Sequence, residues 1–377
     1  MKFQLITIVT GLIIGTGFTS PATANNLVHH SLIGDESKQK GLAIDLAQDI
    51  DSPQSAEEYF ERGVLYYKSG DAQKALADYN RAIELDSQLA EVYLARGILY
   101  GTSEEVEKAL ADFNRAIELN PQFAQAYFSR GFFYGELGEA QKALTDFNQA
   151  IELEPQLAEA YAARGVLYGE SGQAQKALTD LNRAIELNSQ LAEAYYNRGF
   201  LYKQLGDARK ALADYDRAIE LDSQLVKAYV ARGVLYGESG QAQKALTDFN
   251  RVIELNPQHA KVYSNRGLLY VQLGETEKAL ADYDRAIELN PQLAEVYSNR
   301  GNLYKRLEEA QKALADYDRA IELDSQLAEA YANRGLLYAQ SGNVSQGKKD
   351  LEIAADLFLQ QGDDRSYQKV SQMLQQL

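Results

Sequence analysis

The stretch KALADYDRAIEL occurs three times, at residues 210–221, 278–289 and 312–323. The copies are offset by 68 and 34 residues, so both offsets are multiples of one 34-residue period. A catalytic site needs its residues only once, whereas a fixed period of this length is typical of a repeat architecture in which each repeat is one supersecondary unit. The sequence therefore predicts one extended array rather than several unrelated domains.

The period runs through most of the chain, because a tyrosine recurs every 34 residues. These tyrosines are Tyr59, Tyr93, Tyr127, Tyr161, Tyr195, Tyr229, Tyr263, Tyr297 and Tyr331. If the alanine or valine three residues before each of them is position 1, all nine repeats have glycine at position 8 and tyrosine at position 11. Positions 4, 8 and 11 share one face of a helix, and the glycine lets a neighbouring helix approach closely. The pattern predicts the first helix of each repeat.

A second helix is predicted from the rest of each repeat. A glycine at position 15, such as Gly70, Gly138 or Gly274, supplies a left-handed residue at which the first helix ends. Position 20 is alanine in all but the last repeat, position 24 is tyrosine, phenylalanine or leucine, and position 27 is usually alanine, which together mark one apolar face. Proline at position 32 in four repeats predicts the end of this helix.

The tyrosines at positions 4 and 11, glycine at 8, alanines at 20 and 27, aromatic residue at 24 and proline at 32 resemble the tetratricopeptide repeat (TPR). The resemblance implies an all-α fold, a right-handed superhelical solenoid of about nine 34-residue helix-turn-helix repeats with a C-terminal capping helix. It also implies that the first helices line a concave groove, and that the protein is of the secreted or periplasmic bacterial type. One departure is systematic: position 7 is arginine and position 23 is aspartate in every repeat.

Four segments are predicted along the chain: a signal peptide at 1–24, a polar leader at 25–55, nine repeats at 56–361 and a capping helix at 362–377. The signal peptide is indicated by Lys2, an apolar run from about residue 5 to 18, and the small residues Ala22 and Ala24 before a cut at Asn25. An uncleaved anchor is the alternative, although the run is too short to span a bilayer comfortably. We expect the mature chain outside the cytoplasm, with one possible short helix at 38–50 in the leader.

The last repeat and the residues after it are expected to close the array. A 34-residue helix pair is below the roughly 40 residues at which a chain can usually fold alone, so each repeat needs its neighbours and the ends need caps. In the ninth repeat Gly347 replaces the alanine of position 20 and the pattern loosens. Tyr367, Val370, Leu374 and Leu377 fall on one face of a final helix, with glutamines opposite.

The charge and the cysteine count exclude several classes of function. The chain has 38 basic and 54 acidic residues, a net charge of -16, which repels nucleic acid and anionic lipid. It has no cysteine, so disulfides and thiolate metal sites are excluded. We expect no nucleic-acid partner and, after cleavage of the leader, no stable membrane insertion.

The arginine at position 7 and the aspartate at position 23 are the most regular polar feature. A guanidinium in a packed helix seam needs a bidentate carboxylate, which an equal number of aspartates at a fixed offset supplies. The sequence predicts structural pairing, and an anion-binding stripe of arginines is the alternative.

The groove is predicted from positions 5, 9 and 12 of the first helices, which lie away from the face of positions 4, 8 and 11. Apolar side chains there would be costly unless a partner covered them, although neighbouring helices could bury them instead. Glycine at position 12 in four repeats would leave room, and three basic residues would attract an acidic segment. The predicted groove residues are Phe60, Val64, Tyr67, Leu94, Ile98, Phe128, Phe132, Val166, Tyr196, Phe200, Lys203, Val230, Val234, Asn302, Lys305 and Arg306.

Enzyme chemistry has little support in the sequence. No nucleophile elbow, phosphate-binding loop or zinc-protease motif is present, and of three histidines His29 and His30 lie in the leader. No cofactor, metal site or catalytic residue is predicted. Some TPR proteins bind acidic chain ends through a lysine and asparagine clamp, but Lys261 and Asn265 form only part of one, since no repeat has lysine at position 5.

These observations predict a non-enzymatic scaffold or adaptor that binds a peptide or helix of a partner protein in the groove. The alternative is a structural protein that associates with copies of itself. An enzyme with a site that no motif reveals is a third, weaker reading.

Overall fold

The computed structural model describes Ala43, Ala47 and residues 52–377. The predicted signal peptide and nearly all of the predicted leader lie outside these residues. Ala43 and Ala47 fall in the short helix predicted at 38–50 and are both helical and buried. The chain divides into two compact units, Met1–Leu201 and Tyr202–Leu377, with the division inside α12. Each unit is described by itself.

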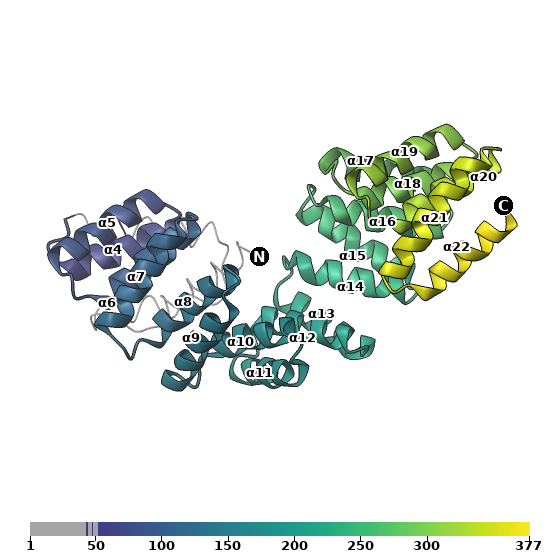
Figure 1. Cartoon of the computed structure of the whole chain (residues 1–377). Helices are drawn as coiled ribbons and strands as arrows, with labels where there is room; N and C mark the ends of the chain where they lie inside the picture. Colours follow the sequence, from purple (N-terminus) through teal and green to yellow (C-terminus); the bar gives the residue numbers. More distant parts are fainter. Residues whose placement is uncertain (1–42, 44–46, 48–51) are drawn as a thin grey trace. The chain divides into compact units, whose positions relative to one another are not determined.

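The described part of the chain contains nineteen helices and no strand, which confirms the all-α fold of helix-turn-helix repeats (Figure 1). The first helices of the nine repeats are α4 (Ala56–Ser69), α6 (Ala90–Thr102), α8 (Ala124–Glu136), α10 (Ala158–Glu170), α12 (Ala192–Gln204), α14 (Val226–Glu238), α16 (Ala260–Gln272), α18 (Ala294–Arg306) and α20 (Ala328–Gln340). The second helices are α5 (Ala72–Leu85), α7 (Val106–Leu119), α9 (Ala140–Leu153), α11 (Ala174–Leu187), α13 (Ala208–Leu221), α15 (Ala242–Leu255), α17 (Thr276–Leu289), α19 (Ala310–Leu323) and α21 (Val344–Gln360). The last helix is α22 (Asp364–Gln376).

The helices begin and end for local reasons that the sequence carries. Ser55 starts α4 with a capping box. Its hydroxyl accepts a hydrogen bond from the backbone N–H of Glu58, and the Glu58 carboxylate accepts one from the backbone N–H of Ser55. Gly70 ends α4 in the left-handed conformation, with φ at 87°, as predicted. In the second and eighth repeats, which lack this glycine, Glu104 and Glu308 adopt the left-handed conformation instead.

The predicted apolar face of the second helices forms the core. The alanines at position 20, such as Ala109 and Ala143, and at position 27, such as Ala116, have no exposed surface. The aromatic side chain at position 24 packs against the glycine at position 8. A Cβ atom added to Gly97 would lie 2.7 Å from the Phe113 ring, so the glycine sets the distance between the two helices.

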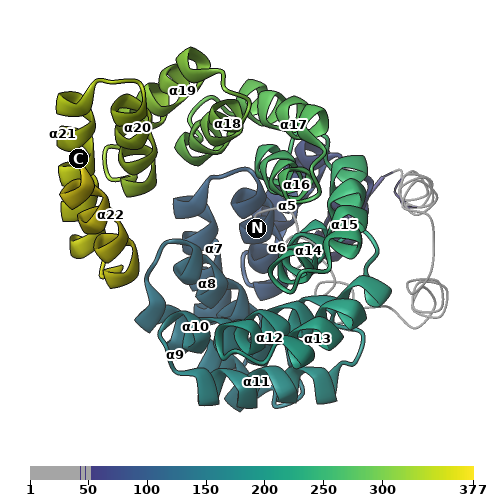
Figure 2. The same ribbon diagram turned by 90° about the vertical axis from the view of Figure 1, so that its right-hand side faces the viewer.

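The C-terminal end is tighter than the sequence indicates. A Cβ atom on Gly347 would lie 2.7 Å from the carbonyl oxygen of Gly335, so α20 and α21 approach backbone to backbone. Glycine in place of alanine at position 20 therefore allows a close crossing of α20 and α21, and it does not mark a loosened pattern. Helix α22 packs next to α21 and buries Val370, with Tyr367 and Leu374 partly covered, whereas Leu377 is exposed (Figure 2).

The predicted pairing of positions 7 and 23 is confirmed for eight repeats. In the second repeat, Arg96 donates from Nε and Nη2 to the two carboxylate oxygens of Asp112, at 2.8 Å each. The buried pairs are Arg62–Asp78, Arg96–Asp112, Arg130–Asp146, Arg164–Asp180, Arg232–Asp248, Arg266–Asp282, Arg300–Asp316 and Arg334–Asp350. The hydrogen bonds that Arg130 donates to Asp146 raise the pKa of Arg130 despite its burial. Since a fold contact uses these guanidinium groups, they do not form an anion-binding stripe.

From the second repeat on, the position-7 arginine also reaches the repeat before its own, which was not predicted from the sequence. Nη1 of Arg96 donates to Oδ1 of Asn80 at 2.7 Å, and an asparagine or aspartate occupies the same position 25 in the later links. The Arg96 guanidinium also lies 5.6 Å from the ring centroid of Tyr93 and 5.7 Å from that of Tyr100. Because the tyrosines at positions 4 and 11 flank the arginine, they contribute cation–π attraction as well as burial.

Alanine at Gly97 is expected to destabilise the second repeat by about 1 to 3 kcal/mol, because the new methyl group would overlap the Phe113 ring. The matched control is Gly135→Ala, since nothing lies within 4 Å of the added Cβ atom and alanine favours a helix by up to about 1 kcal/mol. Native-state amide hydrogen exchange measures both effects locally. Equal protection in the two variants would contradict the packing role of Gly97.

Lysine in place of Arg130 is expected to lower the free energy of unfolding by about 1.5 to 3 kcal/mol, because lysine keeps the charge but loses the bidentate bond to Asp146 and the link to Asn114. The control is Arg183→Lys, in an exposed pair with Glu186, for which we expect about 0.5 kcal/mol or less. Urea unfolding followed by circular dichroism compares them. Similar midpoints would show that the buried pair contributes no more than the exposed one.

Candidate partner-binding face

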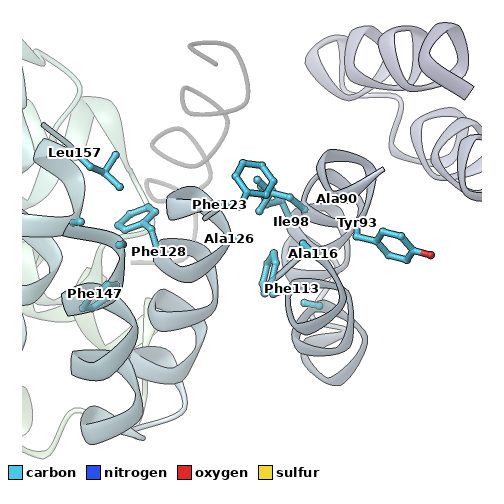
Figure 3. Packing of buried hydrophobic residues seen from close by; sticks show 14 of the residues in the cluster. Ala90, Tyr93, Ile98, Phe113, Ala116, Phe123, Ala126, Phe128, Phe147 and Leu157 are labelled. Atoms are coloured by element: carbon cyan, nitrogen blue, oxygen red, sulfur yellow. The ribbon is translucent and has the colours of Figure 1, made fainter. Parts of the chain in front are cut away.

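The first-helix face is the set of side chains at positions 5, 9 and 12 of the first helices. Three of the residues predicted to lie exposed on it are in the core of the N-terminal unit. Leu94, Ile98 and Phe128 are only 5%, 3% and 1% exposed. Phe128 lies with Phe147 and Leu157 inside one cluster (Figure 3). The expectation that these three side chains are free to hold a partner is therefore corrected: they are buried in one apolar cluster.

A second group is half-buried and supports the core while keeping part of its surface open. Phe60 lies 6.1 Å from the ring of Tyr79, and Phe132 meets Phe133 edge to face at 5.7 Å. Burial raises the pKa of Tyr67 to about 12. The half-buried predicted residues are Phe60, Val64, Tyr67, Phe132, Val166, Tyr196, Val230 and Val234.

The most exposed apolar side chains on this face are Phe200 and Leu268. Phe200, in the N-terminal unit, is 46% exposed and stacks on Tyr196 with ring centroids 6.5 Å apart. Leu268, at position 9 of α16 in the C-terminal unit, is 45% exposed. Both side chains are much more exposed than Ile98, which occupies the same position of α6.

The glycines at position 12 do not all leave room. A Cβ atom on Gly101 would lie 2.0 Å from the Phe133 ring, so the next repeat fills that space. Nothing lies within 4 Å of the same atom on Gly135. Only some of the space predicted from glycine is therefore open.

The three basic residues differ in their surroundings. Lys203 forms an ion pair with Glu238 of the next repeat, with Nζ 2.8 Å from Oε1. Lys305 is half-buried and has no ion pair within the described residues, and desolvation lowers its pKa. Arg306 is exposed. The prediction that all three attract an acidic segment is thus weakened at Lys203, which the fold already neutralises.

The C-terminal unit has a pocket of about 300 Å³ on this side, between α18 and α20, which lie near each other in Figure 2. Asn302 lines it, and its Oδ1 accepts a hydrogen bond from the Tyr317 hydroxyl at 2.8 Å. The lining residues are Glu295, Ser298, Asn299, Asn302, Leu327, Glu329 and Asn333.

Most of this pocket was missed, because only positions 5, 9 and 12 were considered. Glu295, Ser298, Asn299 and Asn302 occupy positions 2, 5, 6 and 9 of one repeat. These positions have the i, i+3, i+4 and i+7 spacing of one helical face, so helical periodicity alone could have identified them.

A further hollow, of about 550 Å³, lies at the turn between α4 and α5 and is lined by Tyr66 and Lys74 among others. Lys74 pairs with Asp71, and its Nζ lies 5.1 Å from the Tyr66 ring centroid. Both contacts hold its charged group within the turn. Within residues 52–377 and the two described alanines, no group of three acidic, histidine or cysteine side chains could hold a metal ion. None of the described helices is long and apolar enough to cross a membrane.

Comparison with known families agrees with the repeat pattern. The TPR repeat family matches residues 63–103, 167–206, 236–274 and 267–308. Two tetratricopeptide repeat families match residues 97–168 and 301–375, and residues 192–225. No curated protein matches the sequence significantly.

Solved structures share the fold. The crystal structure of YrrB, a TPR protein with an unusual peptide-binding site, is 28% identical, with 48% of this chain and 92% of YrrB covered and a TM-score of 0.40. The Cut9–Hcn1 hetero-tetramer of APC/C gives a TM-score of 0.57 at 14% identity, covering 98% of this chain and 86% of that one. The human IFIT1 dimer with PPP-AAAA gives 0.53 at 13% identity, covering 94% of both chains. From the repeated residues, the stacked helix pairs and the matches to the repeat families, the chain is a tetratricopeptide-repeat protein.

Proposed function

We propose that this chain is a scaffold or adaptor that binds a peptide or helix of another protein on its first-helix face. TPR proteins generally mediate protein–protein interactions and are typically non-enzymatic. A repeat protein presents equivalent positions of successive helices side by side, so contacts with one extended partner can be added repeat by repeat.

The observation that supports this proposal is the exposed apolar surface at Phe200 and Leu268. The side chains at the same position of the adjacent repeats, Val166, Val234 and Asn302, are half-buried, so Phe200 and Leu268 stand out as the most exposed apolar side chains of this face. Covering one such side chain contributes about 1.5 to 3 kcal/mol, while association costs several kcal/mol. One such anchor alone gives weak binding, and the half-buried residues beside it in the same unit supply the additional contact.

We also propose that the protein works outside the cytoplasm, as the signal peptide predicted at 1–24 implies. The supporting observation is the order of features in the leader: Lys2, then an apolar run, then Ala22 and Ala24 before Asn25.

Aspartate at both Phe200 and Leu268 is expected to weaken capture of protein partners from an extracytoplasmic extract at least about tenfold, because a charged group cannot replace a buried apolar contact. The control is Leu359→Asp, which changes an exposed leucine of α21 away from this face. Quantitative mass spectrometry of the captured proteins compares the variants. If the double variant and the control capture the same set, the proposed face is wrong.

The same preparation distinguishes a foreign partner from self-association. Sedimentation velocity of the purified mature chain over a hundredfold range of concentration is expected to give a monomer. A concentration-dependent dimer that Phe200→Asp and Leu268→Asp abolish would instead assign the face to a second copy.

The mature protein is expected to begin at Asn25 when the full sequence is expressed in a Gram-negative bacterium, since signal peptidase requires small residues such as Ala22 and Ala24 before the cut. Intact-mass spectrometry of the periplasmic fraction measures this. Ala24→Leu is the control and is expected to block processing. A chain that keeps residue 1 and stays in the cytoplasm would contradict the proposed location.

A further inference from the structure

We propose that the pocket between α18 and α20 selects a partner segment that carries a lysine or arginine side chain. This inference rests on the proposed function, because it names the chemistry of a partner for part of the same face. It differs from the acidic partner that Lys203, Lys305 and Arg306 suggest in the sequence.

The first observation is the charge of the pocket. Glu295 and Glu329 occupy position 2 of successive repeats, both line the pocket, and both are exposed. Neither forms an ion pair with any residue of the described part, in contrast to Glu288 and Glu322, which pair with arginines on their own helices. Two carboxylates without a counterion make the lining of the pocket negative, which favours a cation there.

The second observation is independent of the carboxylates and concerns a buried hydroxyl. Ser298 is 5% exposed, lines the pocket and has no hydrogen-bond partner among the residues that the structure describes. The hydroxyl of Ser298 is not among the fully enclosed polar atoms, so a ligand in the pocket can supply the missing hydrogen bond. Asn302 directs its oxygen to Tyr317, which leaves its two N–H groups available for an acceptor.

The position of Lys305 gives the partner segment a preferred direction along the face. Lys305 lies ten residues after Glu295 on α18, which is about 15 Å along the helix axis. The negative end of the pocket and the lysine are therefore separated along one helix. A cationic side chain is favoured beside Glu295 and Glu329 and disfavoured toward Lys305.

The size of the pocket limits what can enter it. Its volume of about 300 Å³ is at the lower end for ligand pockets. It suits one long side chain with its adjoining peptide groups better than the width of a helix, so we infer an extended segment at this point of the face.

The experiment selects 12-residue peptides from a random phage-displayed library on the full mature chain. Lysine and arginine are expected to be enriched over the input library. The selected peptides, measured by fluorescence anisotropy, should bind the Glu295→Gln, Glu329→Gln double variant about tenfold or more weakly. They should also lose affinity as salt is raised.

The matched control is the Glu288→Gln, Glu322→Gln double variant, which removes the same two charges from the exposed faces of α17 and α19. It is expected to bind as the unchanged chain does. The charge-reversed variant Glu295→Lys, Glu329→Lys should select acidic peptides instead. Circular dichroism confirms that each variant keeps its helices.

The outcomes separate this inference from the proposed function. Peptides that lose affinity with Phe200→Asp and Leu268→Asp but not with the Glu295 and Glu329 variants would keep the face and overturn the pocket. If the Glu295→Gln, Glu329→Gln variant and the Glu288→Gln, Glu322→Gln variant lose the same affinity, the effect comes from net charge alone. That result would also overturn the pocket. If no peptide is selected at all, a peptide partner is excluded for the pocket and for the proposed function together.

Discussion

The guanidinium of position 7 is the contact on which the rest of this fold depends. In one repeat it binds both oxygens of an aspartate on the second helix, and its third nitrogen reaches the preceding repeat, as Arg130 does with Asp146 and Asn114. A single side chain thus joins the two helices of its own repeat and links that repeat to the preceding one. The planar fork of arginine makes this possible, since lysine has no second and third donor at fixed angles.

This polar seam and the glycine of position 8 fix the distances between helices. They therefore also influence which side chains of the first-helix face are buried and which stay exposed. Where an aromatic side chain of the next repeat enters the available space, the face becomes core: Phe133 fills the space at Gly101, and Phe128 packs into the same cluster. At Phe200 and Leu268, by contrast, apolar surface remains exposed. The surface proposed for a partner is what packing between repeats leaves uncovered.

Charge is distributed by the same contacts. The arginines of position 7 are paired within the seam, and many exposed lysines and arginines are paired within their own turn, as Lys74 is with Asp71. Lys203 is paired between repeats. The carboxylates of Glu295 and Glu329 have no such pairing in the described structure, so part of the net negative charge of the chain is concentrated at a pocket instead of being neutralised.

The sequence by itself determined the repeat period, both helices of each repeat, the turn glycines and the pairing of position-7 arginines with position-23 aspartates. The period needs at least two copies, whereas the other features depend on residues close in sequence or at one fixed offset, so a single repeat is enough to predict them. Only the tertiary structure decided which positions of the first-helix face are buried, since that depends on the side chain that the next repeat contributes. Asn302 is held by Tyr317 and Lys203 by Glu238, while Ile98 is covered and Leu268 is not, although both occupy position 9. Helical periodicity gives the direction of a side chain, but exposure depends on whether another side chain fills the space it points into.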